Sequence, residues 1–360
     1  MIAKSTFRCS RKVTFVYLQS FRNKSNLSVL FYGSDSFSLQ SLKALHSNSF
    51  EFERERVVEN VSVVSGSENN VVSKYAKSNN LRFHLWPFEF QPHAFDIGVV
   101  ASFGKLIPLQ AIENCTHGMI NVHASLLPRW RGAAPIQAAI LNGDTVTGVT
   151  LMKIAPHKFD VGECILQEAI QMHPRITAQE LHPILASLGA KLLIQCLKDL
   201  DYYLSNAKKQ PSEGITLSKK IKKEDGLIVW DKMTSDEVDK RFRALNSFFD
   251  VYTYWIDGLK LKLCDVVDPK LAEEAQIDTL LAGQFKPEQI LPGFIFFHKK
   301  RRQLFIKCCD NKWIAFESIW PTGKKQKINA SSFYSGYMRR VNKNTPIILR
   351  DQSNKENVNA

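Results

Sequence analysis

Three polar residues stand where two strand-like segments end, and their types suit chemistry at a carbonyl group. Asn121 and His123 lie near the end of the apolar segment 118–125, and Asp160 follows the segment 148–156 by a short turn. A histidine beside a carboxylate is held in one orientation, and its protonated form is favoured. An amide N–H and an imidazolium together stabilise an oxygen that gains negative charge as a carbonyl carbon becomes tetrahedral. The carboxylate can then help to remove a proton from an attacking amine.

Each of these residues also has a purely structural interpretation. A lone histidine is more often a satisfied interior residue than a catalyst, and an aspartate shortly before a glycine, as in Asp160 and Gly162, more often forms a turn. No G-x-G-x-x-G or Walker pattern follows Gly33, and no group of residues has metal-ligand spacing. The candidate chemistry therefore needs neither a metal nor a Ser or Cys nucleophile, provided that the substrate brings its own amine.

Strand-like and helix-like segments alternate in the first half of the chain. Strand-like segments occur at 27–33, 58–66, 97–104, 118–125 and 148–156. This alternation predicts an α/β domain with a doubly wound, mostly parallel sheet that is covered on both faces. Ligands bind beyond the carboxyl ends of such strands, so we expect the three candidate residues to meet at one edge of the sheet.

The second half of the chain has a different pattern. A long amphipathic stretch at 176–206 predicts a helix that closes the first domain. Apolar alternation on both sides of Asp257-Gly258 is typical of a β-hairpin, and the short strands beyond it predict a small β-barrel. The predicted boundaries are 26–206 for a catalytic domain, 207–226 for a basic linker, 227–345 for the barrel and 346–360 for a disordered tail.

The composition favours a polyanionic partner. The net charge is +13, an excess that attracts nucleic acid through long-range electrostatics, although it is also compatible with a basic protein adapted to its compartment. Hydrophobic residues make up 44% of the chain, enough for a buried core, and no apolar run approaches the length of a membrane span. The seven cysteines are scattered without a C-x-x-C pair, which is typical of reduced thiols.

The N-terminal segment, residues 1–25, is basic, contains several serines and lacks any acidic residue before Asp35. This composition is typical of a mitochondrial transit peptide, and an ordinary disordered tail is the alternative. We therefore expect the protein in the mitochondrial matrix.

The segment 118–154, GMINVHASLLPRWRGAAPIQAAILNGDTVTGVTLMKI, closely resembles the central part of the methionyl-tRNA formyltransferases. Its Asn-x-His-x-Ser-Leu-Leu-Pro signature resembles that of the wider formyltetrahydrofolate-dependent transferases and hydrolases. The continuation Arg-Trp-Arg-Gly-Ala-Ala-Pro-Ile-Gln is more particular to the tRNA enzymes. The resemblance extends over most of the chain, and only the N-terminal tail and residues 268–292 lack a clear counterpart. It implies a formyltransferase domain followed by a barrel similar to an oligonucleotide-binding fold.

The resemblance implies a reaction in which the formyl group of 10-formyltetrahydrofolate passes to the α-amino group of methionine on initiator tRNA, without a metal. Carried over by position, Asn121 and His123 stabilise the tetrahedral oxyanion, and Asp160 holds His123 charged and assists proton movement. The pterin ring is expected at the end of the third strand and at the Asp-bearing loop. The implied cofactor-binding residues are Ala101, Ser102, Phe103, Gly104, Leu126, Pro128, Lys158 and Phe159.

The resemblance also gives the positive charge a partner, initiator methionyl-tRNA. Basic residues of the linker and the barrel are expected to contact phosphates, which position an RNA without reading its sequence. Two arginines adjoin the candidate active site, and one of them can instead form a structural ion pair. The expected tRNA-binding residues are Arg129, Arg131, Lys219, Lys220, Lys222, Lys223, Lys324 and Lys325. We expect a monomer that does not bind membranes.

One segment departs from the pattern of this family. Bacterial members carry a basic, Gly-Pro-rich insertion after the second strand. The corresponding segment of this chain, residues 65–80, is shorter and contains no arginine. Recognition of the tRNA acceptor end is therefore expected to depend more on the linker and the barrel.

Two other functions compete with this hypothesis. The first is another folate-dependent formyl enzyme, which acts on a ribonucleotide amine or an amino sugar, or hydrolyses the cofactor. The basic second domain and the segment RWRGAAPIQ argue against it. The second is an RNA-binding protein that has lost catalysis, and the presence of all three catalytic residue types argues against that.

Overall fold

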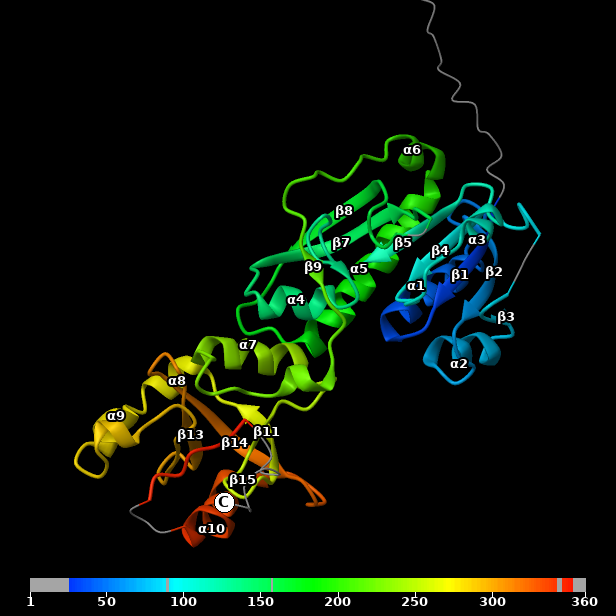
Figure 1. Ribbon diagram of the computed structural model, residues 1–360. Helices are drawn as coiled ribbons and strands as arrows, with labels where there is room; N and C mark the ends of the chain where they lie inside the picture. Colours follow the sequence, from blue (N-terminus) through cyan, green and yellow to red (C-terminus); the bar gives the residue numbers. More distant parts are fainter. Residues whose placement is uncertain (1–25, 89–90, 157, 342–344, 352–360) are drawn as a thin grey trace, which may run out of the picture.

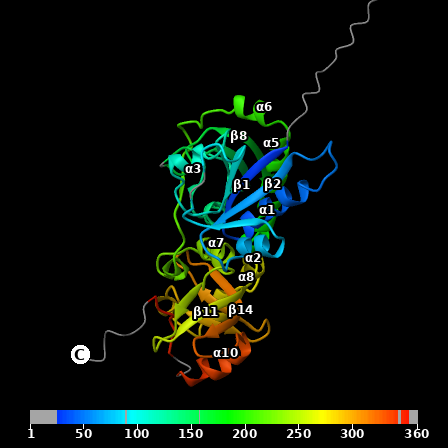
Figure 2. The ribbon, with the colours of Figure 1, turned by 90° about the vertical axis from the view of Figure 1, so that its right-hand side faces the viewer.

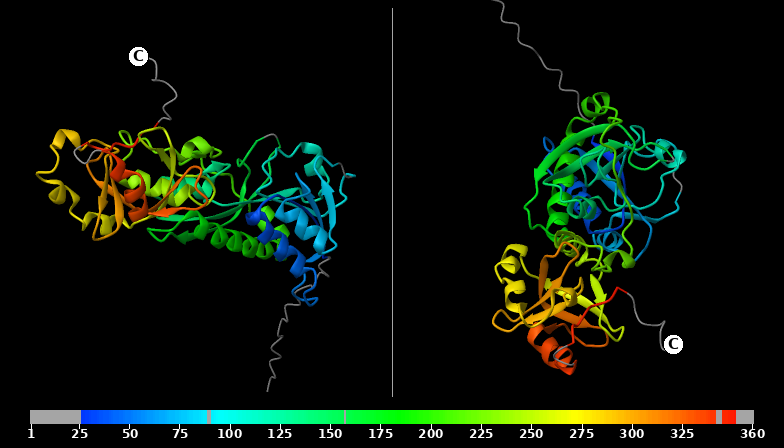
Figure 3. Two further views of the ribbon diagram at one scale, coloured as in Figure 1. Left: turned by 90° about the horizontal axis from the view of Figure 1, so that it is seen from below. Right: turned by 60° about the vertical axis from the view of Figure 1, so that its left-hand side comes forward.

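The computed structural model describes residues 26–88, 91–156, 158–341 and 345–351, so the predicted transit peptide lies outside the described residues. The chain forms an elongated molecule in which a mixed α/β domain and a mostly antiparallel β domain lie end to end (Figures 1 and 3). Within the described ranges, no helix combines the length and apolarity that crossing a membrane would demand.

The first domain is built on a seven-stranded sheet with the order β3-β2-β1-β4-β5-β7-β8. The first five of these strands are parallel, while β7 is antiparallel to β5 and β8 is antiparallel to β7. The predicted doubly wound, mostly parallel fold is thus confirmed, with an antiparallel hairpin at one edge. The strands are β1 (Leu27–Gly33), β2 (Val58–Ser65), β3 (Arg82–Leu85), β4 (Ile97–Ala101), β5 (Met119–His123), β7 (Val146–Lys153) and β8 (Cys164–Gln171).

The two faces of this sheet are covered differently. Val29 and Phe31 of β1 belong to a large buried cluster with residues of α1 (Ser36–Asn48), α2 (Val71–Ser78) and α5 (Ala178–Lys198). Leu30 and Tyr32, which point to the opposite face because side chains alternate along a strand, belong to a smaller cluster. That second face is covered by loops and by the short helix α3 (Leu109–Glu113).

The predicted helix at 176–206 is two helices. Thr177 caps α5 through a capping box with Glu180, which satisfies backbone N–H groups of its first turn. The helix ends at Lys198 because Asp199 adopts a non-helical conformation, with φ −142° and ψ 55°. A short second helix, α6 (Leu200–Ser205), follows.

The second domain is built on an antiparallel sheet with the order β10-β11-β14-β13-β12, and β15 pairs with β14. The predicted hairpin around Asp257-Gly258 is confirmed, since Tyr252 pairs with Lys262 and Tyr254 with Lys260. The strands are β10 (Tyr252–Tyr254), β11 (Lys260–Val266), β12 (Ile295–His298), β13 (Gln303–Lys307), β14 (Trp313–Pro321) and β15 (Ile328–Asn329). The helices of this domain are α7 (Ser235–Leu245), α8 (Pro269–Glu273), α9 (Ile277–Leu281) and α10 (Ala330–Gly336).

Part of the predicted disordered tail closes this sheet. Arg350 bridges Tyr254 at one edge, and Ile348 bridges Phe294 beside the other edge. Leu349, between them, is buried. The prediction of disorder from residue 346 was therefore wrong for residues 347–350, because these residues supply the backbone hydrogen bonds that two edge strands lack.

The predicted linker does not run freely between the domains. Its strand β9 (Leu217–Ser218) pairs in parallel with β6 (Arg131–Gly132), and Lys208 forms two backbone hydrogen bonds with Cys164. The 3-10 helix at Lys223–Gly226 follows β9. Residues 208–218 therefore belong structurally to the rim of the first domain.

The two domains meet through α7, which lies at their junction (Figure 2) and packs against α4 (Pro135–Leu141) of the first domain (Figure 1). A buried ion-pair network adds to this contact. Asp239 of α7 pairs with Arg175 of the first domain at 2.5 Å and with Arg243 at 2.8 Å. The Arg243 guanidinium also donates to the backbone carbonyl of Ile176, at 2.9 Å.

Candidate functional site

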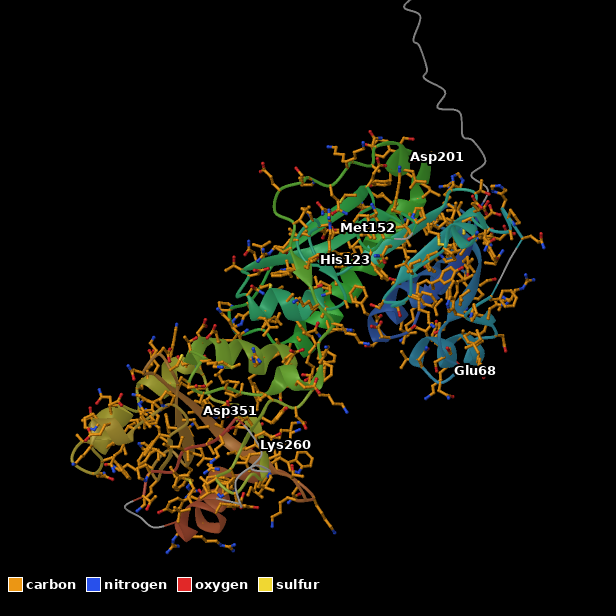
Figure 4. The ribbon with its side chains drawn as sticks, in the orientation of Figure 1. Glu68, His123, Met152, Asp201, Lys260 and Asp351 are labelled. Carbon is orange, nitrogen blue, oxygen red and sulfur yellow. The ribbon has the colours of Figure 1, made fainter. Side chains whose placement is uncertain are left out.

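A cavity of about 640 Å³ opens beyond the carboxyl ends of β4 and β5. It lies where the strand order reverses between β1 and β4, the position at which open α/β sheets bind ligands. His123 and Met152 both line it and lie in the middle of the first domain, far from Lys260 of the second domain (Figure 4).

The three candidate catalytic residues converge in this cavity. The Asn121 side-chain amide donates to Oδ1 of Asp160 at 3.2 Å, and Nδ1 of His123 lies 3.6 Å from the same oxygen. Both His123 and Asp160 are buried. The expectation that an amide, an imidazole and a carboxylate lie at one sheet edge thus agrees with the geometry.

The Asp160 carboxylate is held by its backbone and by its neighbours. Oδ2 accepts the backbone N–H of Gly132 at 2.8 Å, and the Asp160 backbone has φ +53°. A non-glycine residue in this left-handed region costs about 1–2 kcal/mol, so the surrounding contacts must hold it in place. Gly162, two residues later, is required, because a Cβ there would lie 1.7 Å from the carbonyl oxygen of Lys153.

The His123 ring is oriented by the Arg-Trp-Arg segment. Nε2 lies 2.9 Å from the backbone carbonyl of Trp130. Because a carbonyl only accepts, this nitrogen carries a proton, and the ring turns Nδ1 toward Asp160. Trp130 is fixed in turn by its indole N–H, which donates to Asp144 at 2.7 Å.

Arg129 forms the structural ion pair that was expected of one of the two arginines. Its Nε and Nη2 donate to the two carboxylate oxygens of Asp144, at 2.8 and 2.5 Å, and its guanidinium lies over the Trp130 ring at 4.3 Å. These hydrogen bonds raise the pKa of Arg129. Arg131 is engaged as well, since it donates twice to Oε1 of Gln210. Both arginines therefore support the active-site loop, and phosphate contact would compete with these partners.

The predicted folate residues divide into two groups. Five of the eight line the cavity, namely Ser102, Phe103, Gly104, Lys158 and Phe159. Three do not, namely Ala101, Leu126 and Pro128. Ala101 is buried at the end of β4, and Leu126 points toward Gly148 of β7. Leu126 and Pro128 lie outside the cavity lining because the chain after His123 turns away and is held by Thr150.

The cavity wall contains residues that the sequence analysis did not select. The first turn of α4 and the residues just before it supply Ala133, Pro135, Ile136 and Gln137. They belong to the GAAPIQ segment, so their position directly after the arginines was an available signal. The cavity is also lined by Asp35 and Phe37 at the start of α1, by His182 of α5 and by Phe248 after α7. No local motif marks these four, which only the fold brings together. Burial lowers the pKa of His182.

The remaining site expectations concern metals, thiols and surface lysines. Among the described residues, no group of three His, Cys, Asp or Glu side chains could hold a metal ion. The six cysteines in the described ranges are free. The six lysines expected to bind tRNA are all exposed, four of them around the end of the linker and two in the turn after β14.

Two family models match the chain, and each matches one domain. The formyl transferase model covers residues 26–197, and the formyl transferase C-terminal domain model covers residues 220–338. The chain therefore belongs to the formyl transferase family. Within that family it belongs with the methionyl-tRNA formyltransferases, as its similarity to individual members shows.

Mitochondrial methionyl-tRNA formyltransferase of Bos taurus is 38% identical over 320 residues, which are 88% of this chain and 79% of the bovine protein. The human mitochondrial enzyme has the same identity and coverage. The bacterial methionyl-tRNA formyltransferase of Carboxydothermus hydrogenoformans is 30% identical over 86% of this chain and 97% of its own length.

Solved structures support the fold. An N-formyltransferase from Helicobacter canadensis, crystallised with folinic acid and dTDP-3-aminofucose, aligns with a TM-score of 0.52 and 17% identity. The alignment covers 80% of this chain and 98% of that one. HypX from Aquifex aeolicus aligns with a TM-score of 0.55 and 14% identity over 88% of this chain and 50% of its own length.

Proposed function

We propose that this protein transfers the formyl group of 10-formyltetrahydrofolate to the α-amino group of methionyl-tRNA. The observation that carries this proposal is the convergence of Asn121, His123 and Asp160 in one cavity of a chain similar to methionyl-tRNA formyltransferases over both domains. Since the similar mammalian enzymes are mitochondrial, the product is initiator tRNA for translation in the mitochondrial matrix.

The three residues divide the chemistry among them. The Asn121 amide has two N–H groups, so one remains for a carbonyl oxygen while the other donates to Asp160. His123 lies between the Trp130 carbonyl and the Asp160 carboxylate, and we propose that it acts as an imidazolium whose positive charge stabilises the same oxygen. Asp160 keeps His123 charged and accepts the proton that the attacking amine releases, directly or through water.

The cavity fits the folate donor at the end of β4. Ser102, with φ +42°, and Gly104, with φ +71°, line the cavity on a sharply turning backbone, and the buried Phe103 lies between them. Backbone polar groups next to apolar side chains suit a flat heterocycle with a polar edge. When bound, the folate supplies the formyl carbon. We propose that Ser102, Phe103 and Gly104 hold its ring and that Lys158 and Phe159 cover it.

The RNA substrate is assigned to the exposed basic residues. The loop between β2 and α2 spans only residues 66–70, so it cannot supply the basic insertion of the bacterial enzymes. We propose that phosphates of the tRNA contact Lys219, Lys220, Lys222 and Lys223 of the linker and Lys324 and Lys325 of the barrel.

One transfer assay tests the function. Purified protein without residues 1–25 receives labelled 10-formyltetrahydrofolate together with methionyl-tRNA, uncharged tRNA or glycinamide ribonucleotide. Label on methionyl-tRNA alone is the expected result. Label on the ribonucleotide would instead identify a small-molecule formyltransferase, and RNA binding without transfer would identify an RNA-binding protein without this activity.

A further inference from the structure

Gln210 joins the two loops that carry the candidate active site. Its Nε2 donates to the backbone carbonyl oxygens of Asp160, at 2.9 Å, and of Gly162, at 2.8 Å. Its Oε1 accepts from Nε and Nη2 of Arg131, at 3.0 and 2.6 Å. One side chain of the interdomain segment therefore links the Asp160 loop to the Arg-Trp-Arg segment.

The partners of Gln210 fix the orientation of its amide and use its full capacity. Arginine only donates and a carbonyl only accepts, so the oxygen must face Arg131 and the nitrogen must face the loop. Both N–H groups and both lone pairs are then occupied. An amide that is satisfied on both ends between a charged donor and two backbone carbonyls is a rigid connection.

The same segment holds the other side of the Asp160 carboxylate. The Ser218 carbonyl oxygen accepts the backbone N–H of Ala133 at 2.9 Å, next to Gly132, whose own N–H donates to Asp160. A Cβ at Gly132 would lie 2.3 Å from the Ser218 carbonyl oxygen, so the two backbones are in close contact. Asp160 is thus held from one side through Gln210 and from the other through Ser218.

We propose that Gln210, acting with Arg131, is a positioning residue for the Asp160 carboxylate. The interdomain segment thereby helps to fix the geometry of the active site. The inference rests on the proposed function. Its physical basis is the left-handed backbone of Asp160, which needs external contacts to keep its conformation. A displacement of a catalytic group by about 1 Å can cost about 10²-fold in rate.

The decisive variant is Gln210→Leu, assayed for formylation of methionyl-tRNA. We expect kcat to fall by about 10- to 10²-fold, with nearly unchanged KM for both substrates. The matched control is Gln195→Leu, because the Gln195 amide also donates, to the Tyr203 hydroxyl at 2.9 Å, but on the exposed surface of α5. This control should keep wild-type kcat and melting temperature.

Two further measurements separate positioning from general loss of structure. Gln210→Glu keeps an acceptor for Arg131 but cannot donate to the loop, so it should also lose kcat, and it decides the matter if Gln210→Leu does not fold. In an Asp160→Asn background, Gln210→Leu should cause little further loss, since residues that act as a unit are not additive.

Wild-type kcat in both Gln210 variants, or fully additive losses in the double variant, would overturn the inference. Absence of transfer by the wild-type protein would instead refute the proposed function, so the two failures are distinguishable.

Discussion

Charged residues at the active-site edge and on the basic surface are held in different ways. Arg129, Arg131 and Asp160 each have at least two hydrogen bonds to fixed partners. Lys219 and Lys324, by contrast, project from exposed positions. Replacing a residue of the first kind disturbs geometry, whereas replacing one of the second kind changes only the summed electrostatic attraction. Mutational effects should therefore be larger at the active-site edge, where kcat falls, than on the basic surface, where the tRNA binding constant changes.

The largest effect is expected for Asp160→Asn. The amide keeps the size of the side chain but cannot accept a proton or hold His123 charged, so turnover should fall by about 10²- to 10⁴-fold. Affinity for tRNA should stay nearly unchanged, since Asp160 lies in the cavity rather than on the basic surface. Single-turnover transfer and a filter-binding assay give the two values. A variant with near-normal turnover would remove Asp160 from the mechanism.

The next effect concerns stability at the domain junction. Asp239→Ala removes the carboxylate that the buried Arg243 and the partly buried Arg175 share. The loss of this partner should lower the free energy of unfolding by about 3 kcal/mol. Urea denaturation followed by tryptophan fluorescence measures it. The control on the same helix is Asp236→Ala, which breaks the pair between the exposed Asp236 carboxylate and the partly buried Lys240 and should cost at most about 0.5 kcal/mol. Equal losses in the two variants would contradict the distinction between held and exposed charges.

A smaller effect is expected when the linker lysines are changed together. Replacing Lys219, Lys220, Lys222 and Lys223 with alanine should weaken tRNA binding by about 10-fold at low salt, with kcat unchanged. The slope of the logarithm of the binding constant against the logarithm of the salt concentration should become less steep by about one for each phosphate that the variant no longer neutralises. The same four positions changed to arginine keep the charge and should bind normally. A salt dependence that is flat in the wild-type protein would contradict the basic-surface proposal.

The smallest effect separates two lysines near the same turn of the barrel. Lys324→Ala should weaken tRNA binding by about 0.5–1 kcal/mol, because its exposed charge is available to a phosphate. Lys327→Ala should weaken it less, because Lys327 already pairs with Asp265 at 2.6 Å. Titrations at one salt concentration are sufficient for this comparison. A larger loss for Lys327→Ala would show that ion pairing does not decide which lysines bind RNA.

Much of the fold could be predicted because strand ends and hairpins leave local signals. The apolar runs before Asn121 and Asp160 predicted the strands that position both residues, and Asp257-Gly258 predicted the hairpin. The edge strand β8 is not among the predicted strands, because Ile165 is its only buried residue and it lacks the apolar run that marks the central strands.

What could not be predicted depends on hydrogen bonds between distant segments. Leu126 is one of the implied cofactor-binding residues, but Thr150 holds its loop away from the cavity. Gln210 falls within the predicted linker, although its hydrogen-bond partners lie 50 and 79 positions away in the sequence. The residue pattern within either segment does not predict such contacts, because they form only when distant segments meet in the folded chain.

The closure of the barrel by residues 347–350 has a consequence for synthesis of the protein. The first domain has all seven strands of its sheet and the core helix α5 once residue 198 has left the ribosome, so it can pack while translation continues. The second sheet keeps two open edges until Arg350 emerges and pairs with Tyr254. Open edges invite pairing with other chains. A ribosome that stops shortly before residue 347 would therefore release a nascent chain with a finished catalytic half and an aggregation-prone second half.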